Sequence, residues 1–523
     1  MRLNLLTVFD VLTTLFNMSG GLFVIVALLF AAFMRAAYRE RRHFPPGPTG
    51  IPLLGSAHQL PERFQEQKLS EWGKQYGDIV YFKIFRTPAI VLNTIEAARD
   101  LLDRRSAKYS DRPRMVLFSE MIGQEASLPS IGYGERLRRH RKWMFDGVGN
   151  KDKLRSYRDI QRREARTLLR HLVADPARFF DHMHLYLASI MLEITYGKRV
   201  MSLEDELVRV AERGIEGANS AGSPGSMLVD FFPILKYIPT WFPGAGFKRH
   251  ATVVRGYIEE WKNKPYESVV SALASGSDTS SIFASVLAEY GGAPTYAEAE
   301  DMKGLSFSVY GAGVETSRGT LLQFLFHMTR NPRVLSKAQE EIDRVVGSGR
   351  LPDFSDRDSL PYLDAVLEEV YRWRPSLPMA IPHRVISEDK YHDYDIPAGS
   401  MVIPNIWAMT RDIRYFPEPE EFRPERFLAS SAQEGELLLP SSFVFGFGRR
   451  ICPGQAFADA SIWLAIAHVV ALFNVEKAID EAGHETTPRA EFTSGFTIQP
   501  VPFVCNIVPR SDTAAALVAE VGE

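Results

Sequence analysis

Hydrophobic positions form one uninterrupted block near the N-terminus, where no charged side chain occurs over residues 11–34. This run exceeds the ~20 residues that a helix needs to cross a bilayer. Four arginines lie within 35–42, whereas Arg2 is the single basic residue before the run. The positive-inside rule then places the rest of the chain in the cytosol, and we predict a single-pass membrane anchor over 1–34. A cleaved signal peptide is the alternative, which the length of the run and the scarcity of cysteine disfavour.

Proline and basic residues follow the apolar block. The sequence PPGP at 45–48 cannot continue a helix, so we predict a basic, proline-rich hinge over 35–50.

Chain ends are commonly poorly ordered, and we expect a flexible tail over 511–523. The length of 523 residues alone suggests about three domains.

Short extended segments surround a long helical region in the rest of the chain. The pattern predicts strands over 79–84 and 89–92, and extended structure again over 391–403. Between them, 133–372 has a mostly helical pattern. A further apolar helix is predicted over 456–473, where charged and polar interruptions favour a core helix over a second membrane span. The fold class predicted from this pattern is mainly α with small β-sheets.

One predicted helix has an unusual interior. A capping box formed by Thr295 and Glu298 begins it, and the helical pattern continues to about Arg330, which corresponds to roughly 50 Å. Its middle, 311–317, reads GAGVETS, although each interior glycine costs about 1 kcal/mol relative to alanine. A hydroxyl that bonds back to a helix carbonyl opens the helix locally, so we predict a polar groove here. A simple kink with solvated polar residues is the alternative.

Composition narrows the possible classes of protein. The net charge of −3 disfavours nucleic acid as a partner. Only Cys452 and Cys505 are present, which excludes a disulfide framework and a multi-cysteine zinc site and fits a reducing compartment.

Cys452 lies in the segment 445–454, FGFGRRICPG, immediately before the apolar helix. Backbone N–H groups and the positive end of the helix dipole favour a thiolate at such a position. Flat apolar side chains and arginines beside a thiolate suit an iron macrocycle with acidic side arms. A small buried hydrophobe and a catalytic nucleophile are the alternatives, the second without an assignable partner in the sequence. A nucleotide loop is excluded, because a third glycine and a Gly-Lys-Ser/Thr are both missing.

The spacing F-x-x-G-x-R-x-C-x-G resembles the haem-binding loop of the cytochrome P450 family. The resemblance implies one large haem-thiolate monooxygenase domain over 51–510 with haem b as cofactor and Cys452 as the axial ligand of the iron. It carries the haem-loop roles onto these residues of the chain: Phe445, Gly448, Arg450, Cys452 and Gly454.

The GAGVETS segment resembles the oxygen-binding helix of the same family. The resemblance implies that Thr316 delivers protons at the oxygen site and that Glu315 is the acid that feeds this relay. Ala312 and Gly313 are implied to leave space for dioxygen and substrate beside the haem.

Further family motifs imply a scaffold and contacts with the haem propionates. An E-x-x-R motif and a downstream PERF motif correspond to a buried structural triad of Glu369, Arg372 and Arg426. Propionate contacts are implied for Arg141, His383 and Arg450, whereas Leu137 stands where the family has a tryptophan that donates to a propionate. Neighbouring basic residues on the Arg141 helix are expected to form a solvated face that could dock a redox partner. The segments implied to face substrate are 112–129, 305–311, 377–382 and 494–497, which are rich in apolar residues.

The resemblance implies a cytochrome P450 monooxygenase that oxidises a hydrophobic small molecule, with its catalytic domain on the cytosolic side of the endoplasmic reticulum membrane. The implied electron donor is an NADPH–cytochrome P450 reductase, with cytochrome b5 as a further donor. Motif details are most similar to fungal secondary-metabolite members such as O-methylsterigmatocystin oxidoreductase, which suggests a role in secondary metabolism. The alternatives are a haem-thiolate isomerase or dehydratase without a reductase, a monooxygenase that detoxifies xenobiotics, a non-catalytic haem-binding membrane protein, and a cysteine hydrolase.

Overall fold

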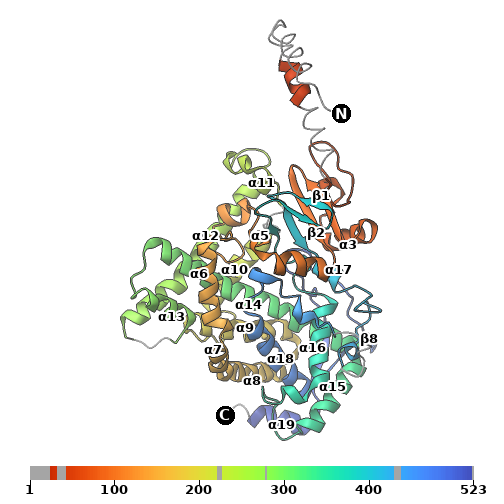
Figure 1. The fold of residues 1–523 in the computed structure, drawn as a ribbon. Coiled ribbons are helices and arrows are strands. Elements are labelled where there is room, and N and C mark those ends of the chain that lie inside the picture. Colours follow the sequence, from red (N-terminus) through yellow and green to blue (C-terminus); the bar gives the residue numbers. More distant parts are fainter. Residues whose placement is uncertain (1–23, 32–42, 221–226, 277–279, 429–436, 521–523) are drawn as a thin grey trace.

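The computed structural model describes residues 24–31, 43–220, 227–276, 280–428 and 437–520, and is mainly helical with three small sheets (Figure 1). The fold class predicted from the sequence is therefore confirmed in its helical and sheet content. Most of the predicted anchor over 1–34 lies outside the described residues. Its described part, 24–31, is helical, and Ile25, Leu28 and Leu29 expose more than half of their surface.

The helices have these bounds: α3 Gln65–Tyr76, α4 Ile95–Ala98, α5 Ser106–Tyr109, α6 Glu135–Met144, α7 Lys151–Ser156, α8 Arg158–Ala174, α9 Phe179–Tyr196, α10 Glu206–Ser220, α11 Leu228–Phe231, α12 Gly246–Ala274, α13 Ile282–Glu289, α14 Tyr296–Arg330, α15 Pro332–Val345, α16 Pro361–Trp373, α17 Ile406–Met409, α18 Gln455–Leu472 and α19 Asp512–Glu520. The strands have these bounds: β1 Ile79–Ile84, β2 Thr87–Leu92, β3 His383–Arg384, β4 Asp389–Tyr391, β5 Tyr394–Ile396, β6 Met401–Pro404, β7 Phe473–Ile479, β8 Glu485–Thr486 and β9 Cys505–Pro509.

The strands lie at the edge of the helical body. The largest sheet has the order β1-β2-β6-β3, in which β1 and β2 form the predicted antiparallel hairpin and β6 runs parallel to β2. The short strand β3 joins this sheet through β6 and carries His383 into the interior. The pairs β4-β5 and β8-β7-β9 make the other two sheets.

Helix α14 begins and ends as its sequence predicts. Thr295 Oγ1 accepts the Glu298 backbone N–H at 3.4 Å, and the Glu298 carboxylate accepts the Thr295 N–H at 2.8 Å, which completes the capping box. The helix continues through Gly311 and Gly313 to Arg330, before Asn331 and a proline. Because it is 35 residues long, it crosses the whole helical body (Figure 1).

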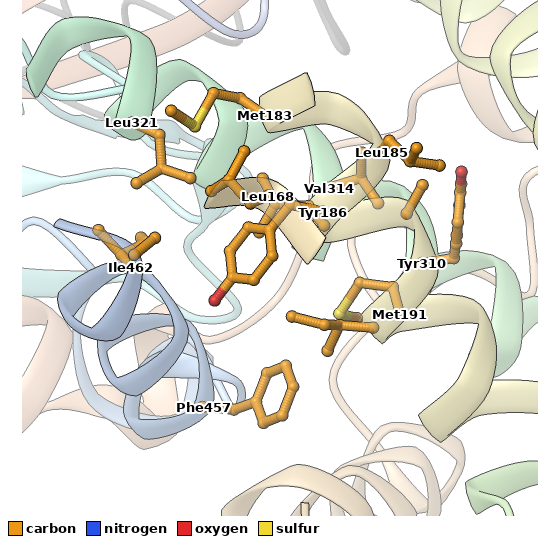
Figure 2. Close-up of a cluster of buried hydrophobic side chains, with 14 of the residues drawn as sticks. Leu168, Met183, Leu185, Tyr186, Met191, Tyr310, Val314, Leu321, Phe457 and Ile462 are labelled. Carbon is orange, nitrogen blue, oxygen red and sulfur yellow. The ribbon is translucent and has the colours of Figure 1, made fainter. Parts of the chain in front are cut away.

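The main core lies where α14 contacts α9 and α18. Figure 2 shows Tyr186 and Met191 of α9 between Val314 of α14 and Phe457 of α18. Helix α18 is the single described helix that is long and apolar enough to cross a membrane, and two-thirds of it, 67%, is buried inside the protein. It therefore serves as a core helix, as the sequence predicts.

The predicted hinge is described from residue 43 onward, where it is not helical, and the predicted tail differs from the structure. Residues 43–48 lie against the first sheet, where the Tyr81 N–H donates to the Pro46 carbonyl at 3.0 Å and the rings of Phe44 and Tyr81 stack. The tail expected over 511–523 is instead the helix α19 over most of its length, with Ala514 and Val518 buried against α8 and α18. The prediction failed because the short alanine-rich segment carries a buried face that only packing partners make visible.

The predicted triad is formed by Glu369 and Arg372 of α16 and by Arg426 of the segment Pro424–Phe427. Glu369 and Arg372 are fully buried, with the Arg372 Nε 2.7 Å from a Glu369 carboxylate oxygen, and Arg426 approaches the same carboxylate at 3.3 Å. The two arginines also donate to backbone carbonyls of Thr410, Pro417 and neighbouring residues. The triad thus fastens the loop 410–427 to α16, and removing one member would leave a buried charge unpaired, which typically costs about 3–5 kcal/mol.

Candidate active site

An internal cavity lies between α14 on one side and the Cys452 loop on the other. Its walls come from α6, α9, α14 and α16, from the segment that leads into β3, and from the loop itself. Of the predicted site residues, the cavity brings together those of both main motifs and both further propionate contacts: Cys452, Phe445, Arg450, Gly454, Ala312, Gly313, Thr316, Arg141 and His383. The residues that lie elsewhere are Gly448, Glu315 and the triad.

The Cys452 loop folds back on itself, because the Cys452 N–H donates to the Phe445 carbonyl at 2.8 Å. Gly448 makes this possible: its φ is +52°, and a Cβ there would lie 2.1 Å from the Leu102 carbonyl oxygen. Gly454 has an ordinary φ of −94° at the start of α18, so the loop does not need its conformational freedom. Phe445 faces the cavity, as expected, while Phe447 is buried in the core beside the first sheet.

The Cys452 thiol is accessible from the cavity and is held at the N-terminus of α18. Burial in the protein raises the pKa of this thiol, while the backbone N–H groups of Gly454 and Gln455 and the Arg141 cation oppose the increase. The helix terminus therefore assists the thiolate but does not outweigh burial. A coordinated metal ion deprotonates a thiol outright, so this site suits a metal ligand better than a free nucleophile.

Among the arginines on the cavity wall, Arg112, Arg141 and Arg450 have no carboxylate bonded to them within the described protein. Arg450 donates to the carbonyls of Ser110, Leu128 and Ile131, and Arg141 donates to the carbonyl of Ile451. Burial lowers the pKa of Arg141, and that of Arg450 to about 10. Buried charges normally require a partner of opposite charge.

Arg112 is the third of these arginines and was not predicted as a cofactor contact. It is 7% exposed, and its Nη1 donates to the carbonyls of Ile381 and Pro382 at 2.6 and 2.7 Å. Its Nε has no hydrogen-bond partner among the described residues. Burial and the nearby Arg450 lower the pKa of Arg112. Nothing in the local sequence separates this arginine from Arg114, because its partners lie about 270 residues away.

His383 completes the basic end of the cavity. The ring Nδ1 lies 2.7 Å from the Tyr109 carbonyl, which can only accept, so Nδ1 carries a proton. Burial and the neighbouring Arg112 hold the pKa of His383 well below its usual range. Leu137 also lines the cavity one turn before Arg141 and supplies no hydrogen-bond donor there.

These groups fit the haem that the sequence resemblance implies. A thiol stands on one wall, apolar side chains line most of the cavity, and unneutralised arginines gather beside His383. Haem propionates would supply the negative charge that this basic group of side chains lacks. The roles of the individual residues toward haem stay predictions.

Ala312, Gly313 and Thr316 line the cavity at the place where the sequence predicts a groove in α14. Thr316 Oγ1 donates to the Ala312 carbonyl at 2.7 Å, which is the expected back-bond, and Gly313 lies against Met191 of α9. A Cβ on Gly313 would come within 2.4 Å of the Met191 Cε.

Glu315 is not part of the cavity wall. Its carboxylate lies 3.1 Å from the Arg318 guanidinium, which in turn donates to His184 Nδ1 at 3.0 Å. Burial raises the pKa of Glu315 and the Arg318 charge opposes the increase, while burial and the same arginine lower the pKa of His184 to about 3. The neutral His184 therefore accepts from Arg318, and Arg318 holds Glu315 beside α9.

The basic face of α6 differs from the solvated surface we expected. Arg136 and Arg139 both form ion pairs with Asp301 of α14, which is 3% exposed. Arg138 and Lys142 are more exposed and pair with carboxylates at the surface. Two of the four cations thus attach α6 to α14 and are not free for a partner.

The cavity wall includes residues from three of the four segments that we expect to face substrate. The segments 112–129, 305–311 and 377–382 all contribute, whereas 494–497 does not. Helix α9 contributes Leu187, Ile190 and Met191, which the sequence motifs did not indicate.

Comparisons with known proteins agree with this geometry. A family model described as Cytochrome P450 matches residues 45–506. The chain is 42% identical to cytochrome P450 monooxygenase 176 of Postia placenta over 97% of each chain. It is 39% identical to cytochrome P450 monooxygenase claR of Ampulloclitocybe clavipes, over 95% of this chain and 92% of that protein. The narrower likeness to O-methylsterigmatocystin oxidoreductase is not shown by these comparisons.

Substitution of Arg112 tests whether the basic end of the cavity binds the cofactor. Arg112→Met should lower haem affinity by roughly 10- to 100-fold, because a hydrogen bond to a charged group contributes about 1.5–3 kcal/mol. The ratio of Soret to protein absorbance after purification and dilution measures this loss. Arg112→Lys should recover part of the haem affinity. Arg114 lies two residues away with an exposed side chain, and Arg114→Met should leave the haem affinity unchanged. Full haem retention in Arg112→Met would contradict the assignment.

Proposed function

Because the chain belongs to the cytochrome P450 family, we propose that it is a membrane-anchored haem-thiolate monooxygenase in which Cys452 is the axial ligand of the iron. The family makes it an oxidoreductase that inserts one oxygen atom of O2 into a small-molecule substrate, with haem b as cofactor. We further assign the residues that carry out this reaction, the class of substrate, the electron donor and the membrane location of the protein. The observation that carries it is the placement of Cys452 and the unneutralised arginines on one cavity.

Cys452 holds the iron from the α18 side in this proposal. When bound, thiolate-ligated haem supplies reductive activation of O2, so that the second oxygen atom leaves as water. Arg112, Arg141 and Arg450 would bind the haem propionates, and His383 would assist them. Phe445 and Leu137 add apolar surface that excludes water from the cofactor.

Proton delivery is assigned to α14. Thr316 presents its hydroxyl to the cavity and can accept and pass on a proton there. Glu315 directly precedes Thr316 in the chain, but its carboxylate is paired with Arg318 away from the cavity. We assign Glu315 the task of resupplying Thr316 after its carboxylate leaves Arg318, and its raised pKa suits an acid that must carry a proton.

The substrate is assigned to the class of hydrophobic small molecules. The cavity wall includes Leu128, Val309, Leu377, Ala380 and Ile381, and these side chains offer no charge for a polar substrate to pair with. The similar proteins are fungal monooxygenases, which supports a role in fungal secondary metabolism. A flavin reductase that uses NADPH is assigned as electron donor, with cytochrome b5 as a further donor, because members of this family typically receive electrons from NADPH through a reductase.

An exposed apolar surface supports attachment to the endoplasmic reticulum membrane. Ile234, Tyr237 and Trp241, between α11 and α12, expose 72, 69 and 78% of their surface. Leu53, in the segment that follows the predicted anchor and hinge, is 81% exposed. Phe85 connects the two segments. Its N–H donates to the Leu54 carbonyl, and its ring contacts Phe231, the last residue of α11, and Phe232, which follows it. A patch of this kind next to an apolar N-terminus suits a lipid surface.

The ligand assignment is tested by the ferrous carbon monoxide spectrum. The full-length protein should show the red-shifted Soret band of a thiolate-ligated haem, and Cys452→Ala should abolish the shift. Cys505→Ala removes the other cysteine, which is partly buried and lies outside the cavity, and should keep the band. A band that survives in Cys452→Ala would refute the ligand assignment.

The proton-delivery role is tested by the coupling of NADPH use to product formation. The Thr316→Ala variant should consume NADPH with little product and release peroxide, because the Thr316 hydroxyl is removed from the cavity wall. Thr329→Ala removes the same type of back-bond from α14, 2.8 Å to the Leu325 carbonyl, and should remain coupled. Tight coupling in Thr316→Ala would contradict the role.

Membrane attachment is tested by flotation with phospholipid vesicles. Deletion of residues 1–42 should reduce the bound fraction strongly, because it removes the apolar anchor. The truncated protein should keep weak binding that Ile234→Glu with Trp241→Glu abolishes. If the truncated protein with both substitutions still floats completely, the proposed attachment is wrong.

A further inference from the structure

Glu368 and Glu369 are adjacent carboxylates of α16 with different partners. Glu369 belongs to the buried triad, whereas Glu368 bonds to Ser441 in the turn Pro440–Ser442, just ahead of the Cys452 loop. The Ser441 N–H donates to one Glu368 oxygen at 2.9 Å, and the Ser441 hydroxyl donates to the other at 2.5 Å. One carboxylate therefore holds two donors of a single residue.

The line of hydrogen bonds continues from Ser441 to the ligand loop. The Ser441 carbonyl accepts the side-chain amide of Gln455 at 2.8 Å. Gln455 begins α18, and its backbone N–H, together with that of Gly454, bonds to the Cys452 thiol. Three hydrogen-bonded residues thus connect the Glu368 carboxylate to the group that donates to the sulfur.

The charges that surround Glu368 are mostly negative. Burial raises the pKa of Glu368 most, and the charges of Asp364 on the same helix and Asp459 on α18 raise it further. The two bonds from Ser441 lower it, and the resulting pKa is about 7. Arg357, the cation of this region, lies 3.0 Å from Asp364 and 2.5 Å from Asp459 and makes no bond to Glu368. Tyr371 is bonded to Asp459 at 3.2 Å. Among these three carboxylates, Glu368 is therefore the one that has no cationic partner in the described part of the chain.

We propose that Glu368 is a positioning residue for Cys452, acting through Ser441 and Gln455, and that its ionisation adjusts the electron-donating strength of the ligand. The inference rests on the proposed role of Cys452 as the iron ligand. An ionised Glu368 can only accept, so it keeps both Ser441 donors and places a negative charge on the ligand side of the haem. A protonated Glu368 carries a proton on one oxygen, so its bond with the Ser441 hydroxyl must reverse or be lost, while the other oxygen can still accept the Ser441 N–H.

The direction of the effect follows from the sign of the charge. Hydrogen bonds and charges around a ligating sulfur tune the potential of the metal. As the pH rises through about 7, Glu368 acquires its negative charge and should favour the ferric form, which lowers the midpoint potential of the haem. Below this pH, the neutral carboxyl should leave the potential higher.

The test compares the midpoint potential of the full-length, haem-containing protein with that of Glu368→Gln between pH 6 and 8. Glutamine keeps the size and an acceptor for Ser441 but cannot ionise. The wild-type potential should fall over this range by more than that of Glu368→Gln, and the two proteins should converge at pH 6. Ser441→Ala, which retains the N–H donor alone, should also lessen the fall.

Glu341→Gln is the matched control. Glu341 is a buried carboxylate that accepts two backbone N–H groups, of Tyr362 and Leu363, both at 3.0 Å, at the start of the same helix. It has no bond to Ser441, so Glu341→Gln should keep the wild-type pH dependence. Equal pH dependence in Glu368→Gln and wild type, or equal loss in Glu341→Gln, would overturn the proposal.

The test separates this inference from the proposed function. If Cys452 were not the ligand, the wild-type protein would lack the red-shifted carbon monoxide band before any variant is compared. If Cys452 is the ligand and Glu368 has no positioning role, the band is present and the pH dependence of Glu368→Gln is unchanged.

Discussion

Uncompensated positive charge inside the protein is the constraint from which the organisation of the site follows. Arg112, Arg141 and Arg450 reach one end of the cavity and bond only to backbone carbonyls there. Carbonyl dipoles orient the guanidinium groups without neutralising them, so the folded chain keeps a strong preference for an anionic group at this position. The carbonyls belong to distant segments, and the same arginines therefore join the Cys452 loop to the chain near residues 110–131 and 381–382.

Adjacent residues of α16 divide the work of holding the ligand loop. Glu369 fastens the loop 410–427 through two arginines, and Glu368 reaches the turn that precedes the Cys452 loop. A helix places neighbouring residues on different sides, so one helix can stabilise two segments at once. The scaffold is thus built close to the sulfur, and its charges are part of the electrostatic environment of the ligand.

Local motifs made much of this architecture predictable from sequence. The capping box at Thr295 and the glycines of α14 are signals carried by neighbouring residues, and the structure has the helix bounds and the Thr316 back-bond that they indicate. What the sequence did not show depends on residues far apart in the chain. The role of Arg112 requires carbonyls about 270 residues later, and Arg318, which pairs with Glu315 three residues before it, is also bonded to His184 of α9. Likewise, α19 is helical because α8 and α18 bury one of its faces.

The central claim, that Cys452 binds the haem iron, is tested most directly by X-ray absorption at the iron edge of the purified protein. The account predicts one sulfur neighbour of the iron in the wild-type protein and none in Cys452→Ala, with the nitrogen neighbours unchanged. A wild-type spectrum with nitrogen and oxygen neighbours alone, or a sulfur neighbour that persists in Cys452→Ala, would contradict it.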